Sequence, residues 1–498
     1  MSNEKKQLIF IMVDTQSADM LGCYGNKHLA TPNIDSLAND GLVYDKAYTC
    51  QPVCGPARSA IFTGLFPHSN GTWTNSVSLY DNVKTVGQRL RDNKIKSAYV
   101  GKWHLDGGDY FGTGKCPDGW DDEYWYDMKR YLDELTPEER LKSRKSSTMK
   151  TEGVDESFTY AHRCSDRAIS YIEKNKDDDF LLVLSYDEPH DPSLCPEPFA
   201  SMYDDYTEKK RDNIYDTLEN KPEHQQIWAG ERRLADRDAL DPTDRLLYAC
   251  NSYVDYEIGR VVDKIKNLIP DATIIYTSDH GDMRNSHCLF GKGPAPYDEI
   301  TRIPFIINGP SAPKGERYKY PISHIDVVPT IMEFMGLNTP VWSEGKSLMP
   351  TLADVDNRIN DAIFIEFGRY EIDHDGFGGF QPMRCVYDGK YKLCVNLLST
   401  DEMYDLENDP FEMNNLIDLE ETAQIRDSLH ERLLDWMNKT RDPFRGYYWR
   451  QRPWRKDPFE ATWRYTGYTR QRENDEYEAR QLDYTTGLEM ENATREKF

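Results

Sequence analysis

Short apolar runs that alternate with helical stretches are the feature that most constrains the fold of this chain. The segments 246–268 and 327–335 lie between such runs and have the pattern of helices. Strands that alternate with helices form a mostly parallel sheet with helices on both faces. We therefore predict an α/β fold whose functional groups gather at the carboxyl ends of the strands. The apolar runs span residues 8–13, 98–100, 180–186, 273–277, 304–308 and 362–367.

The pattern changes near residue 380. A hairpin is predicted from 382–387 and 390–397 around Asp388-Gly389, and a helix is expected over 422–438. We therefore predict a larger α/β domain at 1–378 and a small α+β subdomain at 379–440. Residues 441–498 are rich in Arg, Tyr and Trp and have no apolar periodicity. We expect this extension, which contains Trp449, Trp454 and Trp463, to pack on the body or on a neighbouring subunit of a homo-oligomer.

The charge of the chain excludes two classes of partner. The formal net charge is −25 over 498 residues, so nucleic acids and anionic membranes are repelled by its surface. The first apolar run ends at Asp14 after six residues, which is too short for a signal-peptide core or a membrane span. We therefore expect a cytoplasmic protein. Any anionic substrate needs a local basic pocket built from a few chosen residues.

The ten cysteines are scattered and contain no Cys-x-x-Cys pair. A two-residue turn at Asp388-Gly389 pairs Cys385 with Lys392 and Cys394 with Met383, so these two thiols are not expected to face each other. Reduced thiols are the default inside the cell.

Acidic residues follow two of the predicted strands. Asp14 comes directly after the first run, and Asp279 and His280 follow the run at 273–277. The carboxyl ends of strands in one sheet lie at one edge, so these side chains are expected to meet. Carboxylate oxygens and an imidazole nitrogen suit a divalent ion such as calcium, magnesium or manganese. A single shared cation is therefore predicted.

A cysteine lies at the predicted start of a helix. Gly55 and Pro56 favour a turn into a helix, which places Cys54 at the helix N-terminus. Free backbone amides and the helix dipole favour negative charge there. Arg58 lies one turn further along and adds positive charge. The segment therefore predicts an electropositive thiol that acts as a nucleophile.

Cys54-x-Pro56-x-Arg58, followed by Ser-Ala-Ile-Phe-Thr-Gly, resembles the signature of the type I sulfatases, which depend on formylglycine. Four further motifs of that family occur in order. They are similar to residues 98–104, 187–192, 278–282 with 291–293, and 401–415. The resemblance covers about residues 5–440 and leaves the C-terminal extension unexplained. It implies an alkaline phosphatase-like α/β/α sandwich with a smaller C-terminal subdomain.

The resemblance also implies roles for named residues. A formylglycine-generating enzyme would oxidise Cys54 to formylglycine, whose hydrate is the nucleophile. Asp14, Asp279, His280 and residue 54 would bind the cation, which polarises a sulfate oxygen. Asp279 is also a candidate acceptor of the nucleophile's proton. Arg58 would hold the hydrate, and Lys102 and Lys292 would bind the sulfate oxygens. His190 would protonate the leaving alcohol. His104 would deprotonate the second hydroxyl of the hydrate, which expels sulfate.

The sequence departs from the usual family pattern at two places. Thr15 and Gln16 follow Asp14, where many members have a second acid. His280 follows Asp279, as in phosphonate monoester hydrolases and choline sulfatases, where many sulfatases have asparagine. A phosphonate monoester or phosphodiester hydrolase with the same nucleophile is therefore the alternative activity. Lys102 and His104 favour a sulfate ester over a phosphonate ester, because the phosphonate hydrolases have uncharged residues at the two equivalent positions. The choice among calcium, magnesium and manganese stays open.

A non-catalytic binding protein is the alternative from another class. Proteins of that kind lose the nucleophile, a metal ligand or a charged substrate contact, and none is lost here. The substrate is set by loops expected at 106–127, 188–231 and 370–381, whose Tyr, Trp and Asp residues suit a sugar or an aromatic ring. A sulfated carbohydrate is the first expectation, and an aryl or steroid sulfate is the second.

Overall fold

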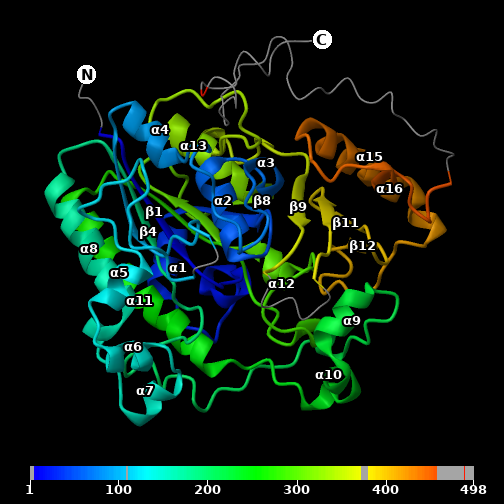
Figure 1. Ribbon diagram of the computed structural model, residues 1–498, viewed down its shortest axis with the longest axis horizontal. Helices are drawn as coiled ribbons and strands as arrows, with labels where there is room; N and C mark the ends of the chain where they lie inside the picture. Colours follow the sequence, from blue (N-terminus) through cyan, green and yellow to red (C-terminus); the bar gives the residue numbers. More distant parts are fainter. Residues whose placement is uncertain (1–4, 108–109, 372–378, 457–486, 488–498) are drawn as a thin grey trace.

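The computed structural model describes residues 5–107, 110–371, 379–456 and 487 (Figure 1). Its largest element is an eight-stranded sheet with the order β3-β4-β1-β5-β7-β2-β6, in which β8 also pairs with β2. The neighbours of β1 are parallel to it, whereas β7 is antiparallel to β5 and β2. The strands are β1 (Gln7–Val13), β2 (Gly41–Tyr48), β3 (Lys96–Gly101), β4 (Phe180–Ser185), β5 (Thr273–Ser278), β6 (Arg302–Ile303), β7 (Phe305–Asn308) and β8 (Glu316–Ser323).

Helices cover both faces of this sheet, which confirms the predicted α/β class. Ile9, Ile11 and Val13 of β1 enter one core with α1 (Pro32–Asn39), α8 (Tyr160–Asn175) and α11 (Arg245–Leu268). Leu8 and Phe10 enter a second core with α2 (Cys54–Thr63), α4 (Val86–Asp92) and α13 (Val327–Phe334). Strands buried on both faces read as continuous apolar runs, and these runs are the pattern seen in the sequence. The shorter helices are α3 (Pro67–Asn70), α5 (Met128–Asp133), α6 (Pro137–Ser143), α7 (Ser147–Thr151), α9 (Glu223–Ala229), α10 (Glu231–Ala235), α12 (Asp298–Thr301), α14 (Met349–Ala353) and α16 (Tyr447–Arg450).

The sequence analysis did not predict three strands of the large sheet: the two-residue β6 and the longer β2 and β8. β8 carries exposed or half-exposed Glu316, Arg317, Lys319 and Tyr320 and pairs with β2 alone. A strand with one partner keeps polar side chains and shows no apolar run. β2 holds Asp45 and Lys46 in its second half, which interrupts its hydrophobic run in the same way.

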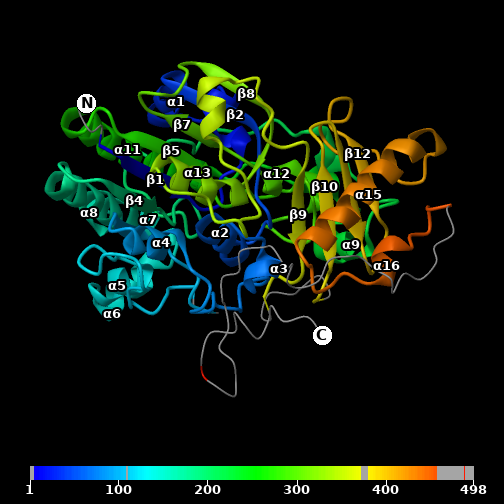
Figure 2. The same ribbon diagram turned by 90° about the horizontal axis from the view of Figure 1, so that it is seen from above.

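A second sheet of four antiparallel strands lies beside the first, with α15 (Ala423–Lys439) packed against it (Figure 2). Its order is β12-β11-β10-β9. The sequence analysis placed residues 362–367 in the large sheet, and this was wrong, because β9 pairs with β10. The small sheet therefore begins before residue 379. Its strands are β9 (Ile363–Phe367), β10 (Met383–Tyr387), β11 (Tyr391–Asn396) and β12 (Glu402–Asp405).

The predicted register of the β10–β11 hairpin was also wrong. Cys385 lies directly opposite Cys394, and Tyr387 lies opposite Lys392. The connection is longer than two residues because the Asp388 carboxylate accepts hydrogen bonds from the backbone amides of Lys390 and Tyr391. This side-chain turn shifts the pairing by two residues. Both thiols are buried and unbridged.

The first part of the C-terminal extension packs on the small sheet and α15. Trp449 and Trp454 belong to the core formed by these elements. Arg452 donates to the Asp401 carboxylate at 2.7 and 2.9 Å, and the Trp454 ring nitrogen donates to the same group at 2.7 Å. Trp463 lies outside the described residues. Across the described ranges, no helix combines the length and hydrophobicity needed to cross a membrane.

Candidate active site

Four neighbouring strands deliver charged side chains to one edge of the large sheet. The sheet order β3-β4-β1-β5 places Lys102, Asp187, Asp14 and Asp279 after adjacent strand ends. The register aligns Gly101 and Met12 with Ser185, and Val13 with Ser278. The strands therefore end level with one another. This is the edge at which parallel sheets place their functional groups.

Gly101 allows the last residue of β3 to approach β4 closely. Its φ is +116°, and a Cβ built there would lie 1.8 Å from the carbonyl oxygen of Ser185. Only glycine fits such an approach. The next amide, that of Lys102, donates to the same carbonyl at 2.8 Å, so Lys102 begins at a fixed position.

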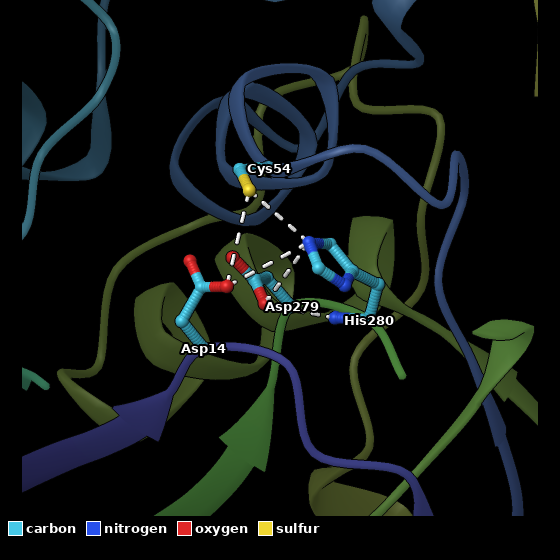
Figure 3. A group of neighbouring side chains, drawn as sticks. All are labelled: Asp14, Cys54, Asp279 and His280. Carbon is cyan, nitrogen blue, oxygen red and sulfur yellow. Dashed lines mark hydrogen bonds and ion pairs between the residues drawn. The ribbon is translucent and has the colours of Figure 1, made fainter. Parts of the chain in front are cut away.

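Cys54 is the first residue of α2, as the sequence predicted, and its side chain points at the strand ends (Figure 3). Its Sγ lies 3.1 Å from Nε2 of His280 and 3.9 Å from Oδ1 of Asp14. Lys292 Nζ donates to the sulfur at 2.8 Å. Burial and Asp14 act to raise the pKa of the Cys54 thiol, but Lys292, Lys102 and His280 outweigh them and hold it well below its usual range.

Arg58, one turn into α2, joins the two carboxylates. Its Nε donates to Oδ2 of Asp279 and its Nη2 donates to Oδ2 of Asp14, each at 3.0 Å, and all three side chains are fully buried. Its Nη1 also donates to the Lys102 carbonyl and the Ser185 hydroxyl. Every side of the guanidinium is therefore occupied by protein, so Arg58 fixes the strand ends relative to α2.

The remaining oxygens of the two carboxylates face the imidazole of His280 (Figure 3). Oδ1 of Asp279 and Oδ1 of Asp14 lie 3.7 and 3.8 Å from His280 Nε2. His280 Nδ1 lies 2.9 Å from the Gly281 carbonyl, which can only accept, so Nδ1 carries a proton and Nε2 is the nitrogen directed at the two carboxylates. Burial acts to lower the pKa of His280, but Asp279 and Cys54 raise it above its usual value. Together with Cys54 Sγ, these ligand atoms all lie within 4.8 Å of one another.

This donor set fits a divalent cation. Two carboxylate oxygens and a neutral imidazole nitrogen are hard or borderline ligands, and their spacing matches a shell with metal–ligand distances of roughly 2.1–2.5 Å. The electrostatics agree, because burial and the neighbouring Asp14 raise the pKa of Asp279 to about 6 despite His280 and Arg58. The pKa of Asp14 behaves in the opposite way: burial acts to raise it, but Lys102, His190 and Lys292 hold it well below its usual range. Asp279 is therefore the carboxylate whose ionised form a bound cation would favour.

Lys102 links the cation-site residues to a second acid. Its Nζ lies 2.8 Å from Oδ2 of Asp14 and 3.0 Å from Oδ1 of Asp187. Burial opposes the charge, but these two carboxylates raise the pKa of Lys102 well above its usual range. The Tyr110 hydroxyl donates to Asp187 at 2.5 Å, and Lys102 Nζ lies 4.1 Å from the centre of the Tyr110 ring. Lys102 therefore stays charged and fixed.

The two candidate proton-transfer histidines differ in environment. His104 is buried, has a left-handed φ of 57°, and its pKa is lowered by burial even though a hydrogen bond with Cys54 acts to raise it. His190 lies further out, with 17% of its side chain exposed. Its Nδ1 lies 2.9 Å from the Asp191 carbonyl and 3.3 Å from the Tyr110 hydroxyl. His104 therefore faces Cys54, whereas His190 lies towards the solvent.

A strained loop delivers Lys292. Four non-glycine residues between β5 and Lys292 have φ between 44° and 66°, a conformation that costs about 1–2 kcal/mol for each such residue. Buried partners hold one of them, His287, whose ring stacks on Tyr297 at 3.8 Å and whose Nδ1 lies 2.6 Å from the Asp216 carboxylate. Tertiary contacts thus impose a backbone path that places Lys292 against Cys54. The four residues are Arg284, Asn285, His287 and Cys288.

The two residues after Asp14 are engaged elsewhere. The Thr15 hydroxyl donates to Oδ1 of Asp14 at 2.7 Å and borders the carboxylate. Gln16 points away, because its amide oxygen accepts from the Tyr276 hydroxyl and its amide nitrogen donates to Asn251, each at 2.5 Å. Gln16 is therefore not directed at the cation-site group.

A second acidic group contains Glu156, His162 and Glu257. Arg260 Nη1 lies 2.6 Å from the Glu257 carboxylate and 3.0 Å from His162 Nδ1. A guanidinium already supplies the positive charge there, so this group does not offer a cation site.

The structure brings together every residue that the sequence analysis selected, and it adds three. The additions are Asp187, Ser185 and Tyr110. Asp187 and Ser185 follow or end a predicted strand, so the strand-end argument that selected Asp14 also applied to them. Tyr110 lies in an irregular loop, and no pattern in the sequence indicated that it would reach Lys102.

Comparisons with known proteins identify the family to which the chain belongs. The sequence model of the sulfatase family matches residues 6–337, and a model described as N-sulphoglucosamine sulphohydrolase, C-terminal, matches residues 286–439. A relative from Escherichia coli K12, described as uncharacterized sulfatase YidJ, is 44% identical over 97% of each chain.

Two solved structures share the fold. One, described as in complex with its substrate D-glucosamine-2-N,6-O-disulfate, has a TM-score of 0.71 at 21% identity, covering 88% of this chain and 98% of that one. The other is the phosphonate monoester hydrolase of Agrobacterium radiobacter, with a TM-score of 0.72 at 22% identity, covering 87% of this chain and 96% of that one.

The family model and the 44% identical relative place the chain in the alkaline phosphatase-like superfamily, and its α/β architecture agrees with this. Within it, the chain belongs to the sulfatase family and is a sulfuric ester hydrolase.

Proposed function

We propose that residue 54, once its thiol has been oxidised to the aldehyde of formylglycine, is the nucleophile that cleaves a sulfate ester held by this site. The observation that carries the proposal is the position of Cys54 at the N-terminus of α2, facing the Asp14–Asp279–His280 group and 2.8 Å from Lys292. A hydrated aldehyde provides two hydroxyls on one carbon, so one can attack sulfur and the other can later release sulfate. A formylglycine-generating enzyme would supply this modification.

The cation would be held by Asp14 Oδ1, Asp279 Oδ1, His280 Nε2 and an oxygen of modified residue 54. A bound divalent ion would favour the ionised nucleophile and withdraw charge from a sulfate oxygen. Calcium, magnesium and manganese all accept such ligands, and the imidazole nitrogen shifts the preference towards manganese or magnesium.

The two lysines contribute positive charge towards the sulfate, and Arg58 neutralises the carboxylates of the site. Lys292, next to Sγ of residue 54, and Lys102, between Asp14 and Asp187, are placed to bind the non-bridging sulfate oxygens as sulfur is attacked. Arg58 offsets both carboxylates and holds the start of α2. A buried guanidinium keeps its charge at all working pH values, so this support does not titrate.

The histidines and Asp279 move protons. Asp279 accepts the proton of the attacking hydroxyl. His190, on the solvent side, donates a proton to the departing ester oxygen. His104, next to residue 54, removes the proton of the second hydroxyl, after which the carbon–oxygen bond to sulfate breaks and the aldehyde returns. The Tyr110 hydroxyl contacts both Asp187 and the ring of His190, and so orients His190 for this proton transfer.

We propose a sulfated carbohydrate as the substrate class, with an aryl or steroid sulfate second. The support is the fold shared with a protein described in complex with a disulfated glucosamine, together with aromatic side chains near the site. Trp73, Phe380 and Phe444 contact one another with ring centres 5.7–6.2 Å apart. The Trp73 carbonyl accepts from Gln51, which precedes Cys54 in the same segment. Of the loop that carries Phe380, residues 372–378 lie outside the described residues.

The test of the proposed function is mass spectrometry of the peptide that contains residue 54, on protein co-produced with a formylglycine-generating enzyme. We expect an aldehyde at residue 54 and, across preparations, sulfatase activity proportional to the aldehyde fraction. Protein with an intact thiol that hydrolyses sulfate esters at the same rate would overturn the proposed nucleophile.

Removal of divalent cations is expected to lower kcat/KM by at least about 100-fold, because the charge on the sulfate and the nucleophile is then uncompensated. The melting temperature should fall as well, since a bound ion stabilises the folded state. Activity is measured after chelation and after separate additions of calcium, magnesium and manganese. Full activity with less than one metal ion per chain would contradict this prediction.

Phosphonate monoester hydrolysis is the second candidate. The pair Asp279–His280 favours it, as does the shared fold of the Agrobacterium radiobacter enzyme. Lys102 and His104 favour sulfate. The two are distinguished by kcat/KM for 4-nitrophenyl sulfate and for 4-nitrophenyl phenylphosphonate, which share a leaving group. We expect the sulfate to be preferred, and the opposite order would favour the phosphonate activity.

A further inference from the structure

A basic segment borders the side of the site on which the alcohol leaves. Residues 140–150 contain three lysines, two arginines and no acidic residue, in a chain with a net charge of −25. Helix α6 ends and helix α7 begins within this segment. Between the two helices, the Ser146 hydroxyl donates to the carbonyl of Pro192, two residues after His190, at 2.9 Å. The basic segment is therefore attached to the loop that carries the candidate acid for the leaving alcohol.

One arginine of this segment, Arg144, packs on an aromatic ring that contacts the site. Its guanidinium carbon lies 5.5 Å from the centre of the Tyr110 ring and 5.1 Å from the centre of the Phe111 ring. The Tyr110 hydroxyl lies 3.3 Å from Nδ1 of His190, and Nζ of Lys102 lies 4.1 Å from the centre of the same ring. A single aromatic side chain thus contacts Arg144, the residue assigned to the leaving alcohol and a residue assigned to the sulfate.

The guanidinium of Arg144 is available to a ligand. Arg144 is exposed, and among the described residues no carboxylate lies within ion-pair distance of it. Two other cations of the segment are paired instead, Arg140 with Asp133 at 3.3 Å and Lys142 with Glu152 at 3.8 Å. A guanidinium that packs on aromatic rings keeps its planar donor edge free and loses little freedom on binding.

The charge of Arg144 acts on a carboxylate inside the site. Burial and Asp14 act to raise the pKa of Asp187, but Lys102, His190 and Arg144 together lower it. Water and salt screen charges that are far apart, so an exposed arginine that acts on a buried carboxylate lies near it. Arg144 therefore lies on the same side of the site as His190 and Asp187, towards the solvent.

We propose that Arg144 binds a second oxyanion of the substrate, a carboxylate or a second sulfate on the saccharide whose departing oxygen His190 protonates. This inference rests on the proposed function and deepens it, because it assigns the substrate class as a saccharide with two anionic groups. Arginine recognises both carboxylate and sulfate through paired hydrogen bonds. The net negative charge of the chain repels such a substrate, so a local cation on the leaving-group side is needed to retain it.

The experiment compares substrates that differ by one anionic group. N-acetylglucosamine 6-O-sulfate and glucosamine-2-N,6-O-disulfate test a second sulfate, and a sulfated hexuronic acid and its methyl ester test a carboxylate. For the wild-type protein we expect the doubly anionic member of at least one pair to have the higher kcat/KM. In Arg144→Ala this preference should fall about 10-fold, mainly through KM. This is the lower end of the range for a lost charge-assisted contact, because solvent screens an exposed charge.

Two control variants separate binding from structure and from general charge. Arg140→Ala removes a cation of the same segment that is already paired with Asp133, and should leave the preference unchanged. Arg144→Lys keeps the charge without the paired donors and should restore part of the preference. The same ligand pairs are titrated calorimetrically into full-length Cys54→Ala protein, with and without Arg144→Ala, so that affinity is measured without turnover.

The outcomes are distinct. Equal kcat/KM or affinity within both pairs for the wild-type site overturns the second-oxyanion site while leaving sulfatase activity intact. An equal loss on both members of a pair in Arg144→Ala overturns it as well, because Arg144 then acts only through the position of Tyr110 and His190. The same loss of preference in Arg140→Ala would replace a specific contact by the general charge of the segment. Absence of turnover of every sulfate ester by aldehyde-bearing protein counts against the proposed function itself, and the calorimetric comparison still decides the oxyanion site.

Discussion

Replacing Cys54 with serine is expected to lower steady-state kcat/KM by at least about 1,000-fold, the range seen when a covalent nucleophile is removed. A serine hydroxyl can take up sulfate, but its carbon has no second hydroxyl, so His104 has no proton to remove and sulfate is retained. Cys54→Ser should therefore release at most one alcohol per chain and then stop. Cys54→Ala should release none. The measurements are the burst amplitude and the mass of the peptide that contains residue 54.

Cys50→Ser is the matched control for this prediction. Cys50 lies in the same segment, is fully buried, and its sulfur lies 3.3 Å from the Ser323 hydroxyl. Its pKa is raised to about 12, mainly by burial, so it is a poor nucleophile. Cys50→Ser should keep most of the activity. Continuous turnover by Cys54→Ser with the rate of the parent would rule out the geminal-hydroxyl mechanism.

Replacing Arg58 with methionine is expected to cost about 3–5 kcal/mol of folding free energy, because it leaves two buried carboxylates without their shared partner. Arg58 donates to Asp14 and to Asp279 at 3.0 Å, and none of the three side chains is exposed. Activity should also be lost in the protein that still folds, since α2 and the strand ends are then no longer joined. Arg58→Lys should recover part of the stability, because one ammonium cannot reproduce both contacts. Stability is measured by urea denaturation at pH 7.

Arg384→Met is the control that separates the loss of folding stability from the loss of activity. Arg384 forms another buried ion pair, with Asp442, at 2.6 Å in the small sheet. Its loss should cost a similar free energy by the same mechanism, yet kcat per folded molecule should stay close to that of the parent. If Arg58→Met and Arg384→Met lost stability and activity in the same proportion, Arg58 would have no role beyond folding.

Much of this protein could be predicted from single segments of the sequence. The apolar run before Asp14 indicated a buried strand because a strand covered on both faces must be apolar at every position. Helix α2 began at Cys54 as expected, because Gly55 and Pro56 set its first turn. Long amphipathic segments such as α11 and α15 were located to within one residue at each end. In each case the deciding interactions lie within the segment itself.

Other features depended on partners that the sequence does not reveal. The strand at 363–367 is as apolar as those of the large sheet, and only its pairing with β10 assigned it to the small one. Cys385 came to face Cys394 because the Asp388 side chain formed a turn of its own. Strand β8 kept polar residues because it has a neighbour on one side only. Local composition cannot distinguish such cases.

The sequence by itself determined the chemical groups of the site: a cysteine at a helix start, acids at strand ends, and the lysines and histidines of the family motifs. Only the tertiary structure decided their neighbours. The order β3-β4-β1-β5 placed Asp187 beside Lys102, and buried contacts held the strained loop of Lys292 in place. The physical reason is that a residue type is fixed by one position in the chain. Distances between charges depend instead on strand order and loop packing, which many distant residues set together.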